Sequence, residues 1–331
     1  IGHAALLANV AGSKSTAIGQ GALNAQNKAD SGAEDSLNTA VGYHAGVAVT
    51  TGLRNTIMGG LAGDALTDAD DNVAVGTHSL TADTKGSRTV AIGKEALAAQ
   101  NFTTATNSNN VAVGAFAGNI LTSGIENTLI GNEAGDSLTG NGFDGSGNRV
   151  AGADYNVAVG YLALSGDTKG SRSVAIGRSA LQVQNFTTAT NAYNVGMGFQ
   201  CGDSITTGIQ NTLIGGLAGD ALTGNGFDGS DNRVAGSDNN TVIGYNALAI
   251  DTKGSKTVAI GHGALATQNF TSETSTYNIA IGSDAGKSIT TGTSNTVLGA
   301  RAVYAGTTTC VGGTFLGYGA GGNSGGVTGD D

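Results

Sequence analysis

The 331-residue sequence has no proline, no tryptophan and only two cysteines, and charged residues make up 12% of it. Without proline the chain cannot form a collagen triple helix, and the absence of proline suits an uninterrupted β-ladder. Two cysteines cannot build a disulfide framework. No apolar run approaches the ~20 residues that span a bilayer, so we expect no membrane insertion.

Basic residues are scarce as well. The chain has 15 Lys and Arg against 25 Asp and Glu, which gives a net charge of −10. Nucleic acids and anionic membrane surfaces attract basic patches, so we expect neither as a partner. Apolar residues are 39% of the chain and the mean hydropathy is −0.01, which argues against disorder caused by excess charge.

Glycine, in contrast, is abundant, with 57 residues. A short signature recurs 17 times: Asn, Ser or Thr, then a β-branched residue, a small or apolar residue, an apolar residue and Gly. The base period is 17, as from Gly76 to Gly93, and successive gaps of 17, 21, 17 and 29 form an 84-residue super-repeat. The signature glycines are Gly2, Gly19, Gly42, Gly59, Gly76, Gly93, Gly114, Gly131, Gly160, Gly177, Gly198, Gly215, Gly244, Gly261, Gly282, Gly299 and Gly317. Such self-similarity predicts a repeat architecture made by duplication of a four-coil unit.

The signature itself predicts a short strand. The residues one and three positions before each Gly lie on one face of the strand, and the residue between them lies on the other. Both faces are mostly apolar, so we expect a strand that is buried on both sides. We expect Gly to provide a positive φ or a close backbone approach, and Asn at the strand start to form a turn or a ladder along the axis.

The predicted fold class is all-β: a parallel β-solenoid, or β-roll, of about 17 coils with two short strands and two turns per coil. The predicted repeat array covers residues 1–303, and residues 304–331 form an irregular Gly-rich C-terminal end or linker. An Ala-filled coil has a thin core that offsets little of its ordering entropy. Self-association into a closed homotrimer would cover the second apolar face, so the chain itself is the first expected partner.

The strings Asn38–Tyr43 (NTAVGY) and Ser173–Gly177 (SVAIG) resemble the repeats of trimeric autotransporter adhesin heads. The 17-residue spacing is more similar still to bacteriophage tail-fibre repeats. The resemblance covers essentially the whole chain. It implies a trimeric, left-handed β-roll or β-solenoid on a virion or an extracellular cell surface.

Binding residues are expected where a gap exceeds the base period, because the extra residues leave the coil and loops on a rigid scaffold often carry recognition. Phe beside Asn, Asp and Thr suits the binding of a host cell-surface glycan, although each Phe could instead fold back against its coil. A host protein is the other candidate partner. The candidate binding residues are Asn101, Phe102, Thr103, Asn185, Phe186, Thr187, Asn269, Phe270, Thr271, Phe143, Asp144, Phe227 and Asp228.

We expect no catalytic site, no metal site and no cofactor. The segments 144–148 and 228–232 resemble calcium loops, with Asp154 available to close the first, but a solvated acidic turn is the alternative. No Ser/His/Asp set or carboxylate pair stands out.

Three functions remain open at this point. The first is the structural shaft of a phage tail fibre or similar surface appendage that presents its loops for attachment. The second is the head or stalk of a bacterial trimeric adhesin. The third is a polysaccharide-degrading tailspike, which is disfavoured because the acidic residues lie in turns rather than in facing pairs.

Overall fold

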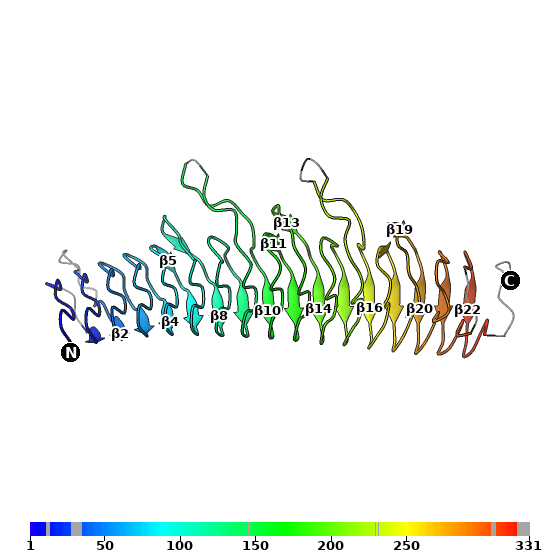
Figure 1. The fold of residues 1–331 in the computed structure, drawn as a ribbon, viewed down its shortest axis with the longest axis horizontal. Coiled ribbons are helices and arrows are strands. Elements are labelled where there is room, and N and C mark those ends of the chain that lie inside the picture. The colour runs from blue at the N-terminus through cyan, green and yellow to red at the C-terminus, as the bar shows by residue number, and fades with distance from the viewer. Residues whose placement is uncertain are drawn as a thin grey trace. The chain divides into compact units, whose positions relative to one another are not determined.

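The structure is a computed structural model that describes residues 1–10, 14–27, 35–144, 146–228, 230, 232–305 and 309–322. These residues contain short strands and turns and no helix (Figure 1). The predicted parallel β-solenoid is confirmed, with about 15 turns. Its mean period of about 18 residues exceeds the 17-residue base spacing because several coils carry inserts.

The chain divides into two compact units, Ile1–Leu162 with Thr168–Ser171, and Ala163–Asp167 with Arg172–Asp331. Each unit contributes eight three-residue strands to a parallel sheet. In the first unit these strands are β1 (Thr16–Ile18), β2 (Thr39–Val41), β3 (Thr56–Met58), β4 (Val73–Val75), β6 (Val90–Ile92), β8 (Val111–Val113), β9 (Thr128–Ile130) and β10 (Val157–Val159). In the second unit they are β12 (Val174–Ile176), β14 (Val195–Met197), β15 (Thr212–Ile214), β16 (Thr241–Ile243), β18 (Val258–Ile260), β20 (Ile279–Ile281), β21 (Thr296–Leu298) and β22 (Thr314–Leu316).

The expectation of two strands in every coil is wrong. Among the residues that the structure describes, additional two-residue strands occur only in or beside the 21-residue gaps: β5 (Gly86–Ser87), β7 (Thr106–Asn107), β11 (Gly170–Ser171), β13 (Thr190–Asn191), β17 (Gly254–Ser255) and β19 (Thr274–Ser275). Elsewhere in the described chain the return limb bonds from coil to coil without forming a regular strand. The Thr50 amide, for example, donates to the Thr67 carbonyl at 2.9 Å, and the Thr67 amide donates to the Thr84 carbonyl at 3.0 Å.

The C-terminal end extends the repeat beyond the predicted boundary at residue 303. Strand β22 pairs in parallel with β21, and Thr296 lies opposite Thr314. The irregular end predicted for 304–331 therefore contains a further strand in register. Residues 306–308 and 323–331 of that segment lie outside the described residues.

The signature glycines have both properties that the sequence predicted. Gly59, for example, has φ +139°, and a Cβ added there would lie 2.5 Å from the carbonyl oxygen of Gly76 in the next coil. Real Cβ atoms do not approach an oxygen so closely, so any side chain would force the coils apart. This contact recurs down both units and restricts the position to Gly, except at the last signature glycine, Gly317, where a Cβ would meet no atom within 4 Å and only the positive φ of +116° favours Gly.

Left-handed backbone is not confined to glycine. In the coil of Gly59, Arg54 (φ 57°) and Leu61 (φ 56°) also take positive φ values, as does Gly63 (φ 50°). The same positions are left-handed in nearly every other coil, with residues as different as Tyr193 (φ 51°) and Leu181 (φ 50°). Such geometry is costly for residues with a side chain, so stacking against the neighbouring coils must compensate for it.

The asparagines at the strand starts form the expected ladder. The Oδ1 of Asn38 accepts the backbone N–H of Asn55 at 2.8 Å, and the Oδ1 of Asn55 accepts that of Asn72 at 3.0 Å. The Nδ2 of Asn55 donates to the Ala69 carbonyl at 2.8 Å. These amides are buried, and each satisfies backbone groups of its own coil and of the next coil.

The coil interior is filled by complementary volumes. Where the fourth residue after the signature Gly is Leu, as at Leu80 and Leu97, the middle strand residue between them is the small Ala91. Where that position is Gly, as at Gly118 and Gly135, the middle residue is Leu129, which is fully buried. A Cβ on Gly135 would lie 2.8 Å from Leu129 Cδ2, so one side chain occupies the space that the other leaves.

Candidate functional site

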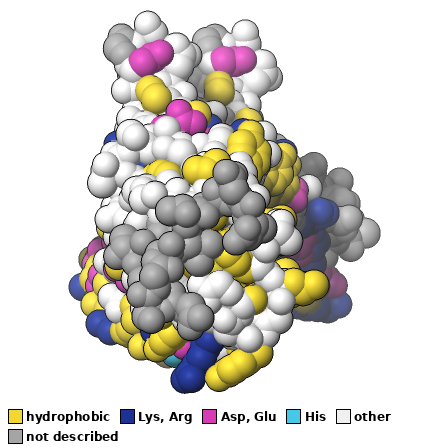
Figure 2. Space-filling view, turned by 90° about the vertical axis from the view of Figure 1, so that its right-hand side faces the viewer, with side chains coloured by type: hydrophobic (Ala, Val, Ile, Leu, Met, Phe, Trp, Pro, Cys, Tyr) yellow, Lys and Arg dark blue, Asp and Glu magenta, His cyan; other side chains and the backbone are white. Residues whose placement is uncertain are grey.

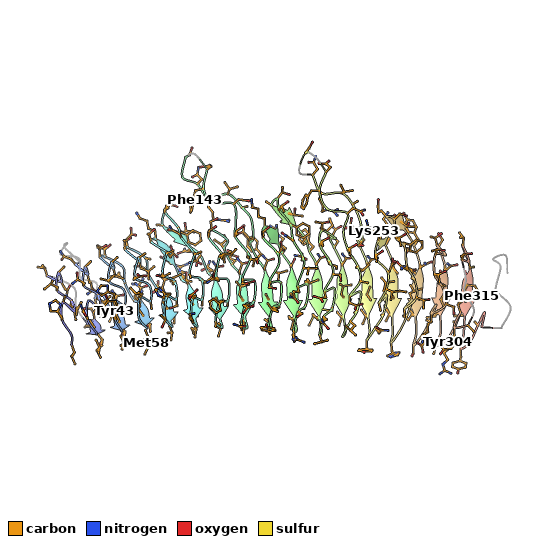
Figure 3. All side chains as sticks on the ribbon, in the orientation of Figure 1. Tyr43, Met58, Phe143, Lys253, Tyr304 and Phe315 are labelled. Carbon is orange, nitrogen blue, oxygen red and sulfur yellow. The ribbon has the colours of Figure 1, made fainter. Side chains whose placement is uncertain are left out.

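The outer face of the three-residue strands is exposed, which corrects the expectation of strands buried on both sides. Only the middle residue of each strand is buried, and its neighbours are half-buried or exposed. Met58, Ile130 and Met197 retain 43%, 38% and 39% of their accessible surface. The single chain leaves this face open because each coil has one such strand and no second layer of described residues packs against it (Figure 3).

This outer face is also uncharged. The described three-residue strands contain Thr, Val, Ile, Leu, Met, Ala, Gly and Phe, and no Asp, Glu, Lys or Arg. Tyr43, Phe199 and Tyr245 follow directly after signature glycines and are about half exposed, with relative exposures of 51%, 47% and 56%. Lys94 and Arg178 occupy the same position in other coils, so the absence of charge holds for the strands themselves. Monomeric proteins rarely expose a contiguous apolar surface of this kind, so the outer strand face is a candidate interface.

The phenylalanines of the 21-residue gaps do not form an accessible ring platform. Phe102 and Phe186 are 0% exposed and Phe270 is 7% exposed. These rings cannot stack on a sugar from this position. The alternative interpretation, in which the ring folds back against its coil, describes all three.

A buried carboxylate fixes each of these inserts. The Oδ1 of Asp83 accepts the backbone N–H of Gly86 at 2.9 Å and that of Phe102 at 3.0 Å, and its Oδ2 accepts the Gln100 Nε2 at 2.6 Å. Burial raises the pKa of the Asp83 carboxyl despite these donors. Asp167 with Gln184, and Asp251 with Gln268, repeat the arrangement once in each following super-repeat. The polar Asp83–Arg88 segment is thus partly internal.

The polar candidates of the inserts lie nearer to solvent. Thr103, Thr187, Thr271 and Asn185 are exposed, and Asn101 and Asn269 are half-buried. Asn101 accepts the Thr84 hydroxyl through Oδ1 at 3.2 Å. The insert therefore presents hydroxyl and amide groups without the aromatic surface that was expected beside them.

The other candidate residues lie on one long loop in each unit, residues 140–152 and 224–236 (Figure 1). Each loop narrows through an antiparallel bridge, Phe143 with Arg149 and Phe227 with Arg233. Both phenylalanines are half-buried, and the Phe143 ring packs edge-on against Phe102 at a centroid distance of 6.3 Å. The sequence thus placed these phenylalanines correctly on loops, but one of them supports its loop.

The exposed aspartates stabilise the turns at the loop tips. Asp144 Oδ1 accepts the backbone N–H groups of Ser146 and Asn148 at 2.9 and 2.8 Å. These hydrogen bonds hold the pKa of Asp144 below its usual value, and the equivalent bonds do the same for Asp228. Figure 2 shows an acidic side chain near the tip of each loop with apolar atoms beneath it. Gly145, Gly229 and Asp231 of the calcium-like segments lie outside the described residues.

Asp154 does not close a calcium loop. Its carboxylate is buried and accepts Arg149 Nη1 at 2.9 Å and the Ile125 backbone N–H at 2.9 Å. Arg233 and Asp238 repeat this ion pair in the second unit. The described residues contain no group of three or more His, Cys, Asp or Glu side chains placed to hold a metal ion.

Sequence reasoning missed two exposed tyrosines at the C-terminal ends of the inserts. Tyr193 and Tyr277 are 50% and 56% exposed, and each lies beside a cation, Arg172 and Lys256 respectively. The available signal was their 84-residue spacing, together with the recurrence of Arg172 and Lys256 at the same spacing.

No family model matches the chain, and no curated protein is significantly similar to it. Within the described part of the chain, no helix is long and apolar enough to cross a membrane.

Proposed function

We propose that the chain is the structural shaft of a surface appendage, such as a phage tail fibre, that self-associates as a homotrimer and presents its loops outward. The proposed location is the outside of a virion or of a cell. The observation that carries the proposal is the uncharged, exposed outer face of the strands in both units.

Apolar burial supports self-association through this face. Two side chains per strand point away from the coil, and removing apolar surface from water contributes roughly 25 cal/mol per Å². Each coil buries only a few Ala, Leu, Ile or Phe side chains in its interior, so a shared interface would add apolar burial that a single narrow coil cannot provide. A closed threefold arrangement lets every copy cover this face with the other two copies, without open growth.

The loops and inserts support an outward attachment role. They leave the coil at positions other than the outer strand face, and the coil after Gly59 folds without them. Buried Asp83 and the Arg149–Asp154 ion pair hold them in defined conformations. Rigidly supported polar loops suit recognition of a cell-surface glycan or protein.

The native mass of the purified chain tests the proposal. A mass three times 32.3 kDa by light scattering is expected. The double variant Met58→Lys with Met197→Lys places one charge on the outer face of each unit and is expected to give monomers, because an unpaired buried charge is strongly unfavourable.

Val183→Lys is the matched control, because Val183 is also 43% exposed but lies outside the strands. This control variant should remain trimeric. A monomeric wild-type chain would contradict the proposal, and so would an equal loss of trimer in the control. Breakdown of a polysaccharide by the wild-type chain would favour the tailspike enzyme instead.

A further inference from the structure

The second unit contains two exposed clusters of the same kind, each made of an aromatic ring, a cation and a neutral polar side chain. In one cluster Lys256 Nζ donates to Ser275 Oγ at 3.0 Å and to Tyr277 Oη at 3.1 Å. In the other, Arg172 Cζ lies 5.8 Å from the Tyr193 ring centroid, and Arg172 also bonds Asn191. The chemistry is kept while the residue types change, Lys for Arg and Ser for Asn.

Lys256 is notable because this acidic chain offers it no carboxylate partner among the described residues. The chain has ten more acidic than basic residues, yet the contacts of Lys256 are with Ser275 and Tyr277. An ammonium group has three donors, and its two neighbours accept two of them. The hydrogen bond from Lys256 lowers the pKa of Tyr277.

The rings themselves are open to a ligand. Tyr277 and Tyr193 are at least half exposed, in contrast to the buried Phe102 and Phe186. An aromatic ring offers an apolar surface for the C–H face of a pyranose, and Lys or Arg offers a charge-assisted hydrogen bond to a carboxylate. A sugar that carries a carboxylate satisfies both groups at once.

The spacing of the two clusters indicates that the ligand is a polymer. They lie four coils apart in the same unit, which corresponds to roughly 19 Å at about 4.8 Å per coil. A linear chain of this length could occupy both clusters and gain avidity without any new contact.

We propose that the Arg172–Tyr193 and Lys256–Tyr277 clusters form a two-point binding site for a linear polysaccharide of carboxylate-bearing sugars. This inference names a ligand class within the proposed surface-attachment role and rests on that role. It moves the binding site from the predicted phenylalanines to the tyrosines at the ends of the same inserts.

The test uses the full chain and calorimetric titration with two uronate probes, oligogalacturonate and oligoalginate, each long enough to span both clusters. A neutral galactose oligomer of equal length is the control ligand. The wild-type chain should bind a uronate oligomer in preference to the neutral one, and added salt should weaken the binding because it screens the cations.

Two sets of variants separate binding from structure. Tyr193→Ala with Tyr277→Ala, and Arg172→Gln with Lys256→Gln, should each weaken uronate binding by about tenfold or more, because both anchors of an avid site are lost. The matched control is Arg88→Gln. Arg88 is the equivalent cation in the first unit, but Asn109 replaces the tyrosine there and the Asp71 carboxylate is close. This control should leave the affinity unchanged.

The outcomes separate this inference from the proposed function. Absence of binding to both uronate probes overturns the site even if the chain is a trimer. Variants that unfold more easily but bind uronate as the wild-type chain does would show that the clusters stabilise the fold and do not bind the ligand. That result would also overturn the proposed site. A monomer that binds uronate through the tyrosines keeps the site and overturns the trimeric shaft.

Discussion

At the residue scale, the repeat depends on backbone geometry that few side chains permit. Gly131 has φ +136°, and a Cβ there would lie 2.4 Å from the Gly160 carbonyl oxygen. The left-handed positions that carry Leu, Arg or Tyr have φ values near +55°, whereas Gly131 has a φ that side chains rarely adopt and also faces the neighbouring coil, so both factors restrict it to Gly.

Replacing Gly131 with Ala is therefore expected to cost about 3 kcal/mol or more of unfolding free energy, since it combines backbone strain with a forced separation of coils. Chemical denaturation at one fixed protein concentration measures the change. Gly317→Ala is the control, because Gly317 is also a signature glycine with a positive φ (+116°) but a Cβ there meets no atom within 4 Å. Equal costs for the two substitutions would show that the close approach of the coils does not restrict the position.

At the element scale, each coil balances the middle strand residue against the fourth residue after the signature Gly. Leu129 fills the space over Gly118 and Gly135, and its truncation leaves a cavity. Leu129→Ala is expected to cost about 2–5 kcal/mol.

The complementarity itself is tested by a double-mutant cycle between Leu129→Ala and Gly135→Ala. In the wild-type background the new Cβ at Gly135 meets Leu129 Cδ2 at 2.8 Å, and in the Leu129→Ala background that clash is gone. The strain at φ +57° is common to both backgrounds and cancels. We expect a coupling of about 0.5–3 kcal/mol between the two sites, measured by chemical denaturation.

A distant pair provides the comparison. Gly135→Ala combined with Leu66→Ala should be additive within about 0.5 kcal/mol, because the two residues share no contact. Additivity in the Leu129 cycle as well would mean that the volumes of successive coils are independent.

At the scale of the whole molecule, the 84-residue super-repeat makes the chain modular. Gly160 and Gly244 occupy the same place in the cycle, and each is followed by Tyr. Repeat proteins derive their stability from neighbouring units, so removal of one complete super-repeat preserves the pattern.

Deletion of residues 161–244, which joins Gly160 to Tyr245, should give a folded protein with an unchanged β-type circular dichroism spectrum per residue. Deletion of residues 161–235 removes a length that does not match the cycle and should disrupt the fold, because a slip in register turns apolar residues outward. A folded product from both deletions would contradict the requirement for register.

The sequence by itself determined the features that recur in every coil: the parallel strand, the Asn ladder, the glycine contact and the buried middle residue. Each of these features imposes the same local requirement in coil after coil. The requirement therefore appears as a period in the sequence, which can be recognised without knowing the distant contacts. The inserts and long loops were likewise located by the departures from that period.

Only the tertiary structure decided which apolar groups are covered. Phe102 and Met58 are both apolar, yet the first is buried beneath an insert and the second faces solvent. The left-handed φ of Arg54 leaves no local sequence signal, and the 84-residue spacing of Tyr193 and Tyr277 does not reveal that each ring lies beside a cation. Burial, strain and side-chain pairing depend on which coil lies next to which, and that arrangement exists only after the chain has folded.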